Sequence, residues 1–204
     1  MSARLWLVRH GRIEANVSGH WHGSTDSPLD DVGHRQIEAV GRWFAGSGVR
    51  FEAVYTSPLQ RTRHTAEAIA RALALDIEAR DDLREYGIGT LEGTPYADLM
   101  VPGGFMERMR NDPQWAPEAG ESLRDVVNRM RCATRAIAQA HPHGEVVVVS
   151  HGAAMGLLLG ELLHDDPLAW RNYHVANCSV TELRLEPEAA LGRFNCTEHL
   201  KGIG

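Results

Sequence analysis

Three short runs of apolar residues constrain the fold of this chain more than any other feature. They span residues 5–8, 53–56 and 146–149, and each ends at a turn that contains serine, proline or glycine. Continuous apolar runs of this length are typical of strands inside a parallel sheet that is covered on both faces. We therefore predict that the three runs are neighbouring or near-neighbouring strands of one sheet.

Helical patterns lie between the predicted strands. Apolar residues recur at helical spacing in residues 33–44, 61–73 and 122–140, and residues 153–163 form a short apolar segment that we expect to be a buried helix. Residues 180–185 alternate as a half-buried strand does, and residues 193–196 are predicted to be a final edge strand. Strands that alternate with helices indicate an α/β fold, a three-layer α/β/α sandwich with a mostly parallel central sheet. We expect residues 1–204 to form a single domain.

One segment, residues 94–120, differs from the rest of the chain. Its prolines and glycines are interleaved with methionine and aromatic residues. We expect an irregular or short-helical excursion that covers the site like a cap, because long connections of this kind often shape active sites.

Composition excludes several classes of protein. The net charge is −6, and the chain has only one lysine and no basic run, so we expect no nucleic-acid partner. The apolar runs are too short to cross a membrane, and no signal-peptide pattern is present, so we expect a cytoplasmic protein without a membrane partner. The three cysteines are expected to be reduced thiols. The sequence leaves a homodimer open.

Two of the predicted strands end in the same way. The run at residues 5–8 leads into Arg9-His10-Gly11, and the run at residues 146–149 leads into Ser150-His151-Gly152. Ligands of α/β sheets bind outside the carboxyl ends of the strands, so two neighbouring strands would bring both histidines to one site. Arg61 falls in the first turn of the helix after the remaining strand, where an anionic ligand would suit it. Such a group of cations and imidazoles favours a compact dianion such as phosphate.

Each of these residues also has a purely structural interpretation. Either histidine could be a satisfied, partly buried side chain, and Arg61 could be an exposed arginine paired with a carboxylate. Glu85 could form a surface salt bridge, for example to Arg84.

Six motifs in order resemble the histidine phosphatase superfamily, also called the phosphoglycerate mutase-like family, and its small phosphatase branch in particular. They run from residue 5 to about residue 183. The motifs are Arg9-His10-Gly11 with Asn16, Asp26-Ser27-Pro28-Leu29 with Gly33 and Gln36, Ser57-Pro58-Leu59-Gln60-Arg61 with Thr65-Ala66, Leu83-Arg84-Glu85 with Gly89 and Leu91-Glu92-Gly93, Gly120-Glu121-Ser122, and Ser150-His151-Gly152. Ile13 stands where the family usually has threonine, and Leu91 where many members have tryptophan.

The resemblance implies a phosphoglycerate mutase-like fold and a phosphate-monoester hydrolase that forms a phosphohistidine. It implies His10 as the nucleophile, Glu85 as the proton donor, and Arg9, Arg61 and His151 as the groups that hold the phosphoryl oxygens. It further implies Asn16 and Gly23 as substrate-binding residues, and a small phosphorylated metabolite as the substrate.

No metal or cofactor is expected, because the arginines supply the positive charge. His20 with His22, and His141 with His143, lie in loop-like sequence without a matching set of four ligands.

Three other functions remain as alternatives. Cys178 and Arg184 have the spacing of cysteine-dependent phosphatases, but the residues between them contain no glycine and alternate like a strand. A mutase would share every catalytic residue and return the phosphoryl group to a substrate instead of to water. A non-catalytic phosphate-binding protein would be expected to lack at least one of the catalytic residues. The excursion at residues 94–120 and the loop around Trp21 are expected to shape the pocket of the leaving group.

Overall fold

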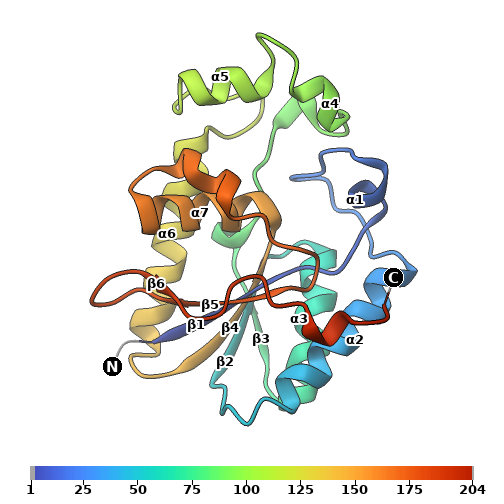
Figure 1. Ribbon diagram of the computed structural model, residues 1–204, viewed down its shortest axis with the longest axis vertical. Helices are drawn as coiled ribbons and strands as arrows, with labels where there is room; N and C mark the ends of the chain where they lie inside the picture. The colour runs from blue at the N-terminus through green and yellow to red at the C-terminus, as the bar shows by residue number, and fades with distance from the viewer. Residues whose placement is uncertain (1–2, 204) are drawn as a thin grey trace.

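The computed structural model describes residues 3–203, which form one six-stranded sheet with helices on both faces (Figure 1). The strands are β1 (Arg4–Arg9), β2 (Ala53–Thr56), β3 (Ile77–Ala79), β4 (Glu145–Ser150), β5 (Val180–Arg184) and β6 (Ala190–Leu191). The helices are α1 (Glu14–Ser18), α2 (Asp31–Ala45), α3 (Gln60–Leu73), α4 (Tyr96–Leu99), α5 (Phe105–Asn111), α6 (Leu123–Ala140) and α7 (Gly152–His164).

The strand order is β3-β2-β4-β1-β5-β6. The first four strands in this order run parallel, and β5 and β6 are antiparallel to their neighbours. The three predicted apolar runs are therefore the adjacent strands β2, β4 and β1 at the centre of the sheet. The predicted fold, an α/β/α sandwich with a mostly parallel sheet, is confirmed.

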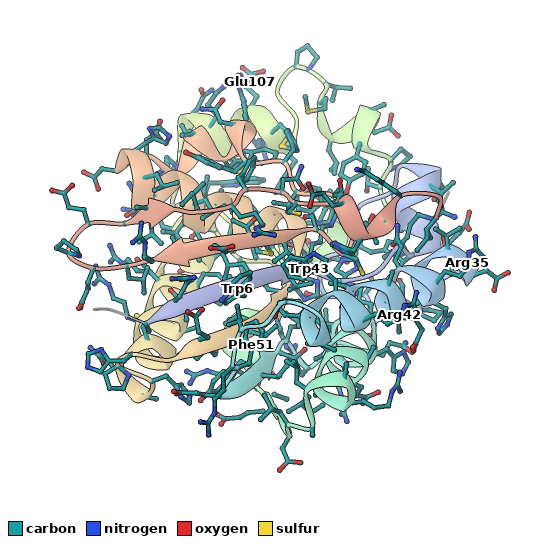
Figure 2. All side chains as sticks on the ribbon, turned by 60° about the horizontal axis from the view of Figure 1, so that its bottom comes forward. Trp6, Arg35, Arg42, Trp43, Phe51 and Glu107 are labelled. Atoms are coloured by element: carbon teal, nitrogen blue, oxygen red, sulfur yellow. The ribbon has the colours of Figure 1, made fainter. Side chains whose placement is uncertain are left out.

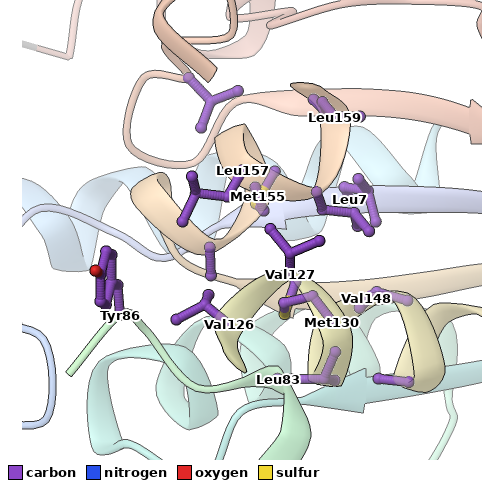
Figure 3. Close-up of a cluster of buried hydrophobic side chains, with 14 of the residues drawn as sticks. Leu7, Leu83, Tyr86, Val126, Val127, Met130, Val148, Met155, Leu157 and Leu159 are labelled. Carbon is purple, nitrogen blue, oxygen red and sulfur yellow. The ribbon is translucent and has the colours of Figure 1, made fainter. Parts of the chain in front are cut away.

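The two faces of β1 serve two separate cores. Leu5 and Leu7 pack with apolar side chains of α6 and α7, and Figure 3 shows Leu7 beside side chains of both helices. Trp6 and Val8 belong to the core on the α2 and α3 side. There the ring centroids of Trp6 and Phe51 are 5.5 Å apart, and Trp43, in the last turn of α2, also packs against Trp6 (Figure 2). A strand buried on both faces reads as a continuous apolar run, which explains the sequence pattern.

Helix starts carry the expected caps. Ser122 accepts a hydrogen bond from the backbone N–H of Asp125 and closes a capping box at α6. Asp30 accepts from the N–H of Gly33, so α2 begins at Asp31, before the apolar pattern becomes visible in the sequence.

The sheet edges differ from the prediction. No strand was predicted at β3, which has only three residues and is partly exposed. The final strand predicted at residues 193–196 is wrong. Cys196 makes a single bridge to Val180, and the edge strand is the two-residue β6.

The segment at residues 94–120 carries α4 and α5. The residues before α4 pair with the loop before Trp21, through a bridge between His20 and Pro95 and a hydrogen bond from the N–H of Tyr96 to the carbonyl of Gly19. Figure 1 accordingly shows α4 directly above α1. These contacts bring the two loops expected to shape the leaving-group pocket to the same side of the molecule.

Candidate active site

His10 follows the last residue of β1 and is almost fully buried. Its Nδ1 lies 2.7 Å from the carbonyl oxygen of Gly11, which can only accept a hydrogen bond. Nδ1 therefore carries the proton of the neutral ring, and the lone pair is on Nε2. Burial, followed by the charges of Arg61 and Arg9, holds the pKa of His10 well below its usual value. His10 thus presents an unprotonated nitrogen, the form that a nucleophile requires.

His151 follows the last residue of β4, the parallel neighbour of β1. The centroids of its ring and that of His10 are 5.2 Å apart, so the two strand ends bring both imidazoles to one place. Nδ1 of His151 accepts from Nε of Arg61 at 3.3 Å, and Nε2 lies 2.8 Å from Oγ of Ser57. Because a guanidinium only donates, the proton of this ring is on Nε2 and points to Ser57. Burial and the charge of Arg61 hold the pKa of His151 well below its usual value.

Arg61 lies in the first turn of α3 and is fully buried. Its Nη1 donates to the carbonyl of Thr25 at 2.6 Å, and its Nη2 donates to the carbonyls of Gly23 at 2.8 Å and His22 at 3.3 Å. The interpretation as an exposed arginine paired with a carboxylate is therefore wrong. Arg61 instead joins His151 to the loop at residues 22–25.

The loop at residues 22–25 is held by Glu92. The Glu92 carboxylate accepts hydrogen bonds from the N–H groups of Gly23, Ser24 and Thr25, and from the hydroxyl of Thr25. A Cβ at Gly23 would lie 2.1 Å from the carbonyl oxygen of Tyr86, so only glycine fits there. Glu92 thereby aims the carbonyls of this loop at Arg61. Glu92 belongs to the Leu91-Glu92-Gly93 motif, but the motif itself does not indicate this role.

Arg9 reaches the site from the last position of β1. Its Nη1 donates to the carbonyl of Val175 at 2.7 Å, whereas its Nε is buried with no hydrogen-bond partner among residues 3–203. A Cβ at Gly152 would lie 3.2 Å from Cζ of Arg9, so the glycine after His151 leaves room for the guanidinium group. Burial lowers the pKa of Arg9, but a guanidinium remains charged in proteins. A buried cationic donor without a partner suits an anionic ligand.

Glu85 follows the short 3-10 turn at Asp81–Leu83, and its carboxylate lies at the N-terminus of α7. Its two carboxylate oxygens accept from the backbone N–H groups of Ala153 and Ala154, in the first turn of that helix, and from that of its neighbour Tyr86. Arg84 pairs with Asp81 and not with Glu85, so the surface salt bridge considered from the sequence is absent. The three backbone donors fix the position of this carboxyl group.

Asn16, in α1, is oriented by a residue that the sequence analysis missed. Its Oδ1 accepts from the backbone N–H of Ile13 at 3.2 Å and from Nδ2 of Asn177 at 3.0 Å. Asn177 also donates to the carbonyl of His10 at 3.0 Å. Asn177 is separated from Asn16 by 161 residues, and no local pattern marks it.

A cavity of about 520 Å³ joins these groups to a wall of apolar side chains. Arg9, His10, Asn16 and Glu85 line it, whereas Arg61, His151 and Gly23 do not. The other lining residues are Ile13, Trp21, His22, Tyr96, Met100, Met106, Gly152, Ala153, Trp170, Arg171, Tyr173, His174 and Val175. The structure therefore places four of the seven predicted site residues at the cavity surface. The other three are connected to them, because His151 lies beside His10 and Arg61 bonds to both His151 and Gly23.

The chain matches the histidine phosphatase superfamily (branch 1) over residues 5–197. It is a member of this superfamily. It is 34% identical over 182 residues to a probable phosphoglycerate mutase, GpmB, of Proteus mirabilis, an alignment that covers 88% of this chain and 84% of the relative. It is 30% identical over 198 residues to an uncharacterized phosphatase, PhoE, of Bacillus subtilis, with 97% and 96% covered.

Solved structures of the superfamily have the same architecture. A phosphoserine phosphatase from Entamoeba histolytica, in complex with 3-phosphoglyceric acid, is similar with a TM-score of 0.86 and 26% identity over 97% of this chain and 99% of that one. A mycobacterial glucosyl-3-phosphoglycerate phosphatase in complex with VO3 has a TM-score of 0.83 and 28% identity over 95% and 99%. The chain thus belongs to a group of phosphatase-type enzymes.

A cysteine-dependent mechanism does not fit this member of the histidine phosphatase superfamily. Cys178 is fully buried, and burial raises the pKa of its thiol far above the usual value. Its backbone N–H donates to the carbonyls of Arg9 and His10. The thiolate that such a mechanism requires is therefore strongly disfavoured.

His22 and His141, one from each of the two histidine pairs considered as metal ligands, contact other side chains of the protein. Nδ1 of His22 lies 2.6 Å from Oγ of Ser27, and His141 contacts Tyr55 and Glu52. Within residues 3–203, no three or more histidine, cysteine or acidic side chains gather closely enough to hold a metal ion. No helix in the same range is long and apolar enough to cross a membrane.

Proposed function

We propose that this chain hydrolyses phosphate monoesters of small metabolites through a phosphohistidine at Nε2 of His10. The observation that carries the proposal is the bond between Nδ1 of His10 and the carbonyl of Gly11. It leaves Nε2 unprotonated in a cavity that also contains Arg9, a cation with a free buried donor. A nucleophile and an anion-binding group at one surface are what phosphoryl transfer requires.

In the first step, the lone pair on Nε2 of His10 forms a bond to phosphorus, and the bond from phosphorus to the leaving oxygen breaks. Glu85 gives its proton to that oxygen, so the alcohol leaves neutral. Arg9 and the amide of Asn16 hold the non-bridging oxygens.

In the second step, water attacks the phosphorus. The Glu85 carboxylate takes a proton from the water, the bond from phosphorus to Nε2 breaks, and inorganic phosphate leaves. In this scheme Arg61 contributes positive charge near the reacting group, and the neutral His151, which accepts a hydrogen bond from Arg61, lies beside His10. A mutase would use the same first step and would differ only in the acceptor of the phosphoryl group.

Rapid quenching tests the proposal. The protein is mixed with a ³²P-labelled phosphomonoester and quenched in alkali, in which phosphohistidine survives. We expect a protein-bound label that is stable to base and labile to acid. The label should be absent in His10→Ala and present in the control variant His34→Ala, which alters an exposed histidine of α2. Absence of any label together with absence of phosphate release would contradict the proposal. Phosphate release without added bisphosphorylated substrate separates hydrolysis from mutase activity.

A further inference from the structure

Several exposed apolar side chains of this protein line one cavity or neighbour a residue that lines it. Five large apolar side chains are exposed in the described part of the chain, and two of them line the active-site cavity. Tyr96 and Met100 line it, and Val101 adjoins Met100. Val17 adjoins the lining residue Asn16, and Phe194 packs edge-on against the lining residue Tyr173 at 5.6 Å. We call these five residues the apolar collar.

Scattered exposed apolar side chains need no explanation, but a group around one opening indicates a binding surface. The wall inside the collar is partly apolar. Trp21, Met106, Trp170 and Val175 line it with the two lining members of the collar, and the same cavity is also lined by the polar side chains of His22, Arg171 and His174. The polar groups nearest the reaction, Arg9, His10, Asn16 and Glu85, are accounted for by the phosphoryl group and the leaving oxygen.

We infer that the leaving group of the natural substrate has an aromatic or branched hydrocarbon body that rests against this wall and the apolar collar. The inference rests on the proposed function, because the reaction fixes the phosphoryl group at His10 and leaves the rest of the cavity for the alcohol. The cavity of about 520 Å³ has room for such a body beside the phosphoryl group. Methionine side chains at Met100 and Met106 adapt to rings of different shape.

A substrate series with equivalent leaving oxygens tests the inference. Ethyl, butyl and 3-phenylpropyl phosphate all release a primary alcohol, so their intrinsic reactivities are similar. Apolar burial favours the larger esters, and we expect kcat/KM to rise about 10- to 100-fold from ethyl to 3-phenylpropyl phosphate. A value for 3-phosphoglycerate equal to or above that for 3-phenylpropyl phosphate would overturn the inference.

Met100 and Val101 provide a matched pair of variants. Both are exposed neighbours, but only Met100 lines the cavity. Met100→Ser is expected to lower the ratio of kcat/KM for 3-phenylpropyl over ethyl phosphate several-fold, and Val101→Ser to lower it less. A different result would assign the collar to a second copy of the chain. In that case the kcat/KM ratio would be the same in both variants and in the unaltered protein, and Val101→Ser would weaken the association of the protein into dimers. Hydrolysis of all esters at similar rates would overturn only this inference, whereas hydrolysis of none would overturn the proposed function.

A second, independent observation concerns Asn177. The backbone N–H of Ile13 can only donate, so the atom of Asn16 that faces it is the oxygen. Asn177 donates to this same oxygen and thereby strengthens that orientation. The Nδ2 of Asn16 is then the polar atom left for the cavity, which Asn16 lines. We infer that Asn177 is a positioning residue that keeps the Asn16 amide turned to donate to a phosphoryl oxygen.

Asn177→Asp tests this inference, because it retains the shape and replaces the donor with an acceptor. An aspartate would face the Asn16 oxygen and the His10 carbonyl, so Asn16 would turn its oxygen toward the phosphoryl group. We expect kcat/KM to fall about 100-fold in Asn177→Asp and about fivefold in Asn177→Ala, since an acceptor facing two acceptors costs more than a lost bond. Activity of Asn177→Asp should recover partly at low pH, where the protonated carboxyl donates.

The same substitutions in an Asn16→Ala background separate positioning from general support of the fold. If Asn177 acts through Asn16, the additional loss from Asn177→Asp shrinks markedly in that background, as a double-mutant cycle measures. The inference would be overturned if the losses of kcat/KM from the substitutions at Asn16 and Asn177 simply added. Equal losses in Asn177→Asp and Asn177→Ala at every pH would also overturn it. Thermal unfolding of each variant shows whether it is folded in the assay, so that only the activities of folded proteins are compared.

Discussion

The two segments in which a strand ends in His-Gly look alike in the sequence but are connected differently in the structure. Both histidines are buried at the ends of neighbouring parallel strands, and in both the pKa is well below the usual value. Nδ1 of His10 donates a hydrogen bond to the backbone carbonyl of Gly11, and Nε2 is left for a ligand. The His151 ring lies between two side chains, Arg61 and Ser57, that occupy both nitrogens. The strand end places a histidine, and its hydrogen-bond partners decide what chemistry it can perform.

The glycines after the two histidines differ in the same way. A Cβ at Gly11 would lie 2.9 Å from the carbonyl oxygen of Gly33, so this glycine permits close packing against α2. A Cβ at Gly152 would press on the guanidinium group of Arg9. One glycine thus serves the fold, and the other makes room for a charged group of the site.

The largest difference between the two histidines is expected on removal of the ring. His10→Ala removes the nucleophile, and we expect kcat to fall about 10⁴-fold or more, with no phosphoenzyme formed. Steady-state turnover and the alkaline quench measure both quantities. Formation of a phosphoenzyme at normal rate in this variant would assign the nucleophile to another residue.

His151→Ala should be less severe. It removes one group beside the transferring phosphoryl and frees Arg61, and we expect kcat to fall about 10²- to 10³-fold. Unlike His10→Ala, this variant should still form a phosphohistidine, but slowly, and the burst phase of a rapid-quench experiment measures that rate. If His151→Ala abolishes the label and His10→Ala retains it, the roles of the two rings are exchanged.

Ser57→Ala sharpens the comparison by altering one nitrogen of His151 only. The loss of one hydrogen bond to Nε2 is expected to lower kcat/KM about fivefold, with the unfolding free energy lowered by about 1 kcal/mol. Kinetic assays and urea unfolding test these values. An effect as large as that of His151→Ala would mean that Ser57 itself contacts the substrate.

The smallest difference between the two histidines is expected in the pH dependence of stability, where they should act alike. Their folded-state pKa values are depressed, so below pH 6.5 the unfolded chain binds protons that the folded chain does not. Stability is therefore full above pH 6.5 and falls as the pH decreases, by about 1.4 kcal/mol per pH unit for each histidine. Urea unfolding between pH 7.5 and 5 measures the slope. His10→Gln should reduce it, and an unchanged slope would show that His10 is not neutral in the fold.

The sequence is informative where one segment carries its own signal. Strands β1, β2 and β4 are buried on both faces and are visible as apolar runs, and the long helices show their apolar stripes. Strand β3 has only one large apolar residue, Ile77, and the segment predicted as the final strand pairs only through a bridge at Cys196, so tertiary packing decides both edges. Short edge strands have little pattern of their own.

The same reasoning applies to the site. His10, Arg61 and His151 follow strands or begin helices, Glu85 follows a 3-10 turn, and their motifs are local. The partners that set their geometry are remote in the chain. Ser57 is 94 residues from His151, and Asn177 is 167 residues from His10. Only the fold brings such pairs together, so the tautomers and the amide orientation could not be predicted.

The position of Glu92 has a consequence for how this architecture can diversify. Glu92 holds the loop that supports Arg61, and it does so immediately before the segment at residues 94–120 begins. The residue that supports Arg61 thus precedes α4 and α5 in the sequence. That segment can be lengthened, shortened or exchanged while the phosphoryl-transfer groups keep their places. Proteins with this architecture can therefore accept phosphate esters of different alcohols when this one segment changes.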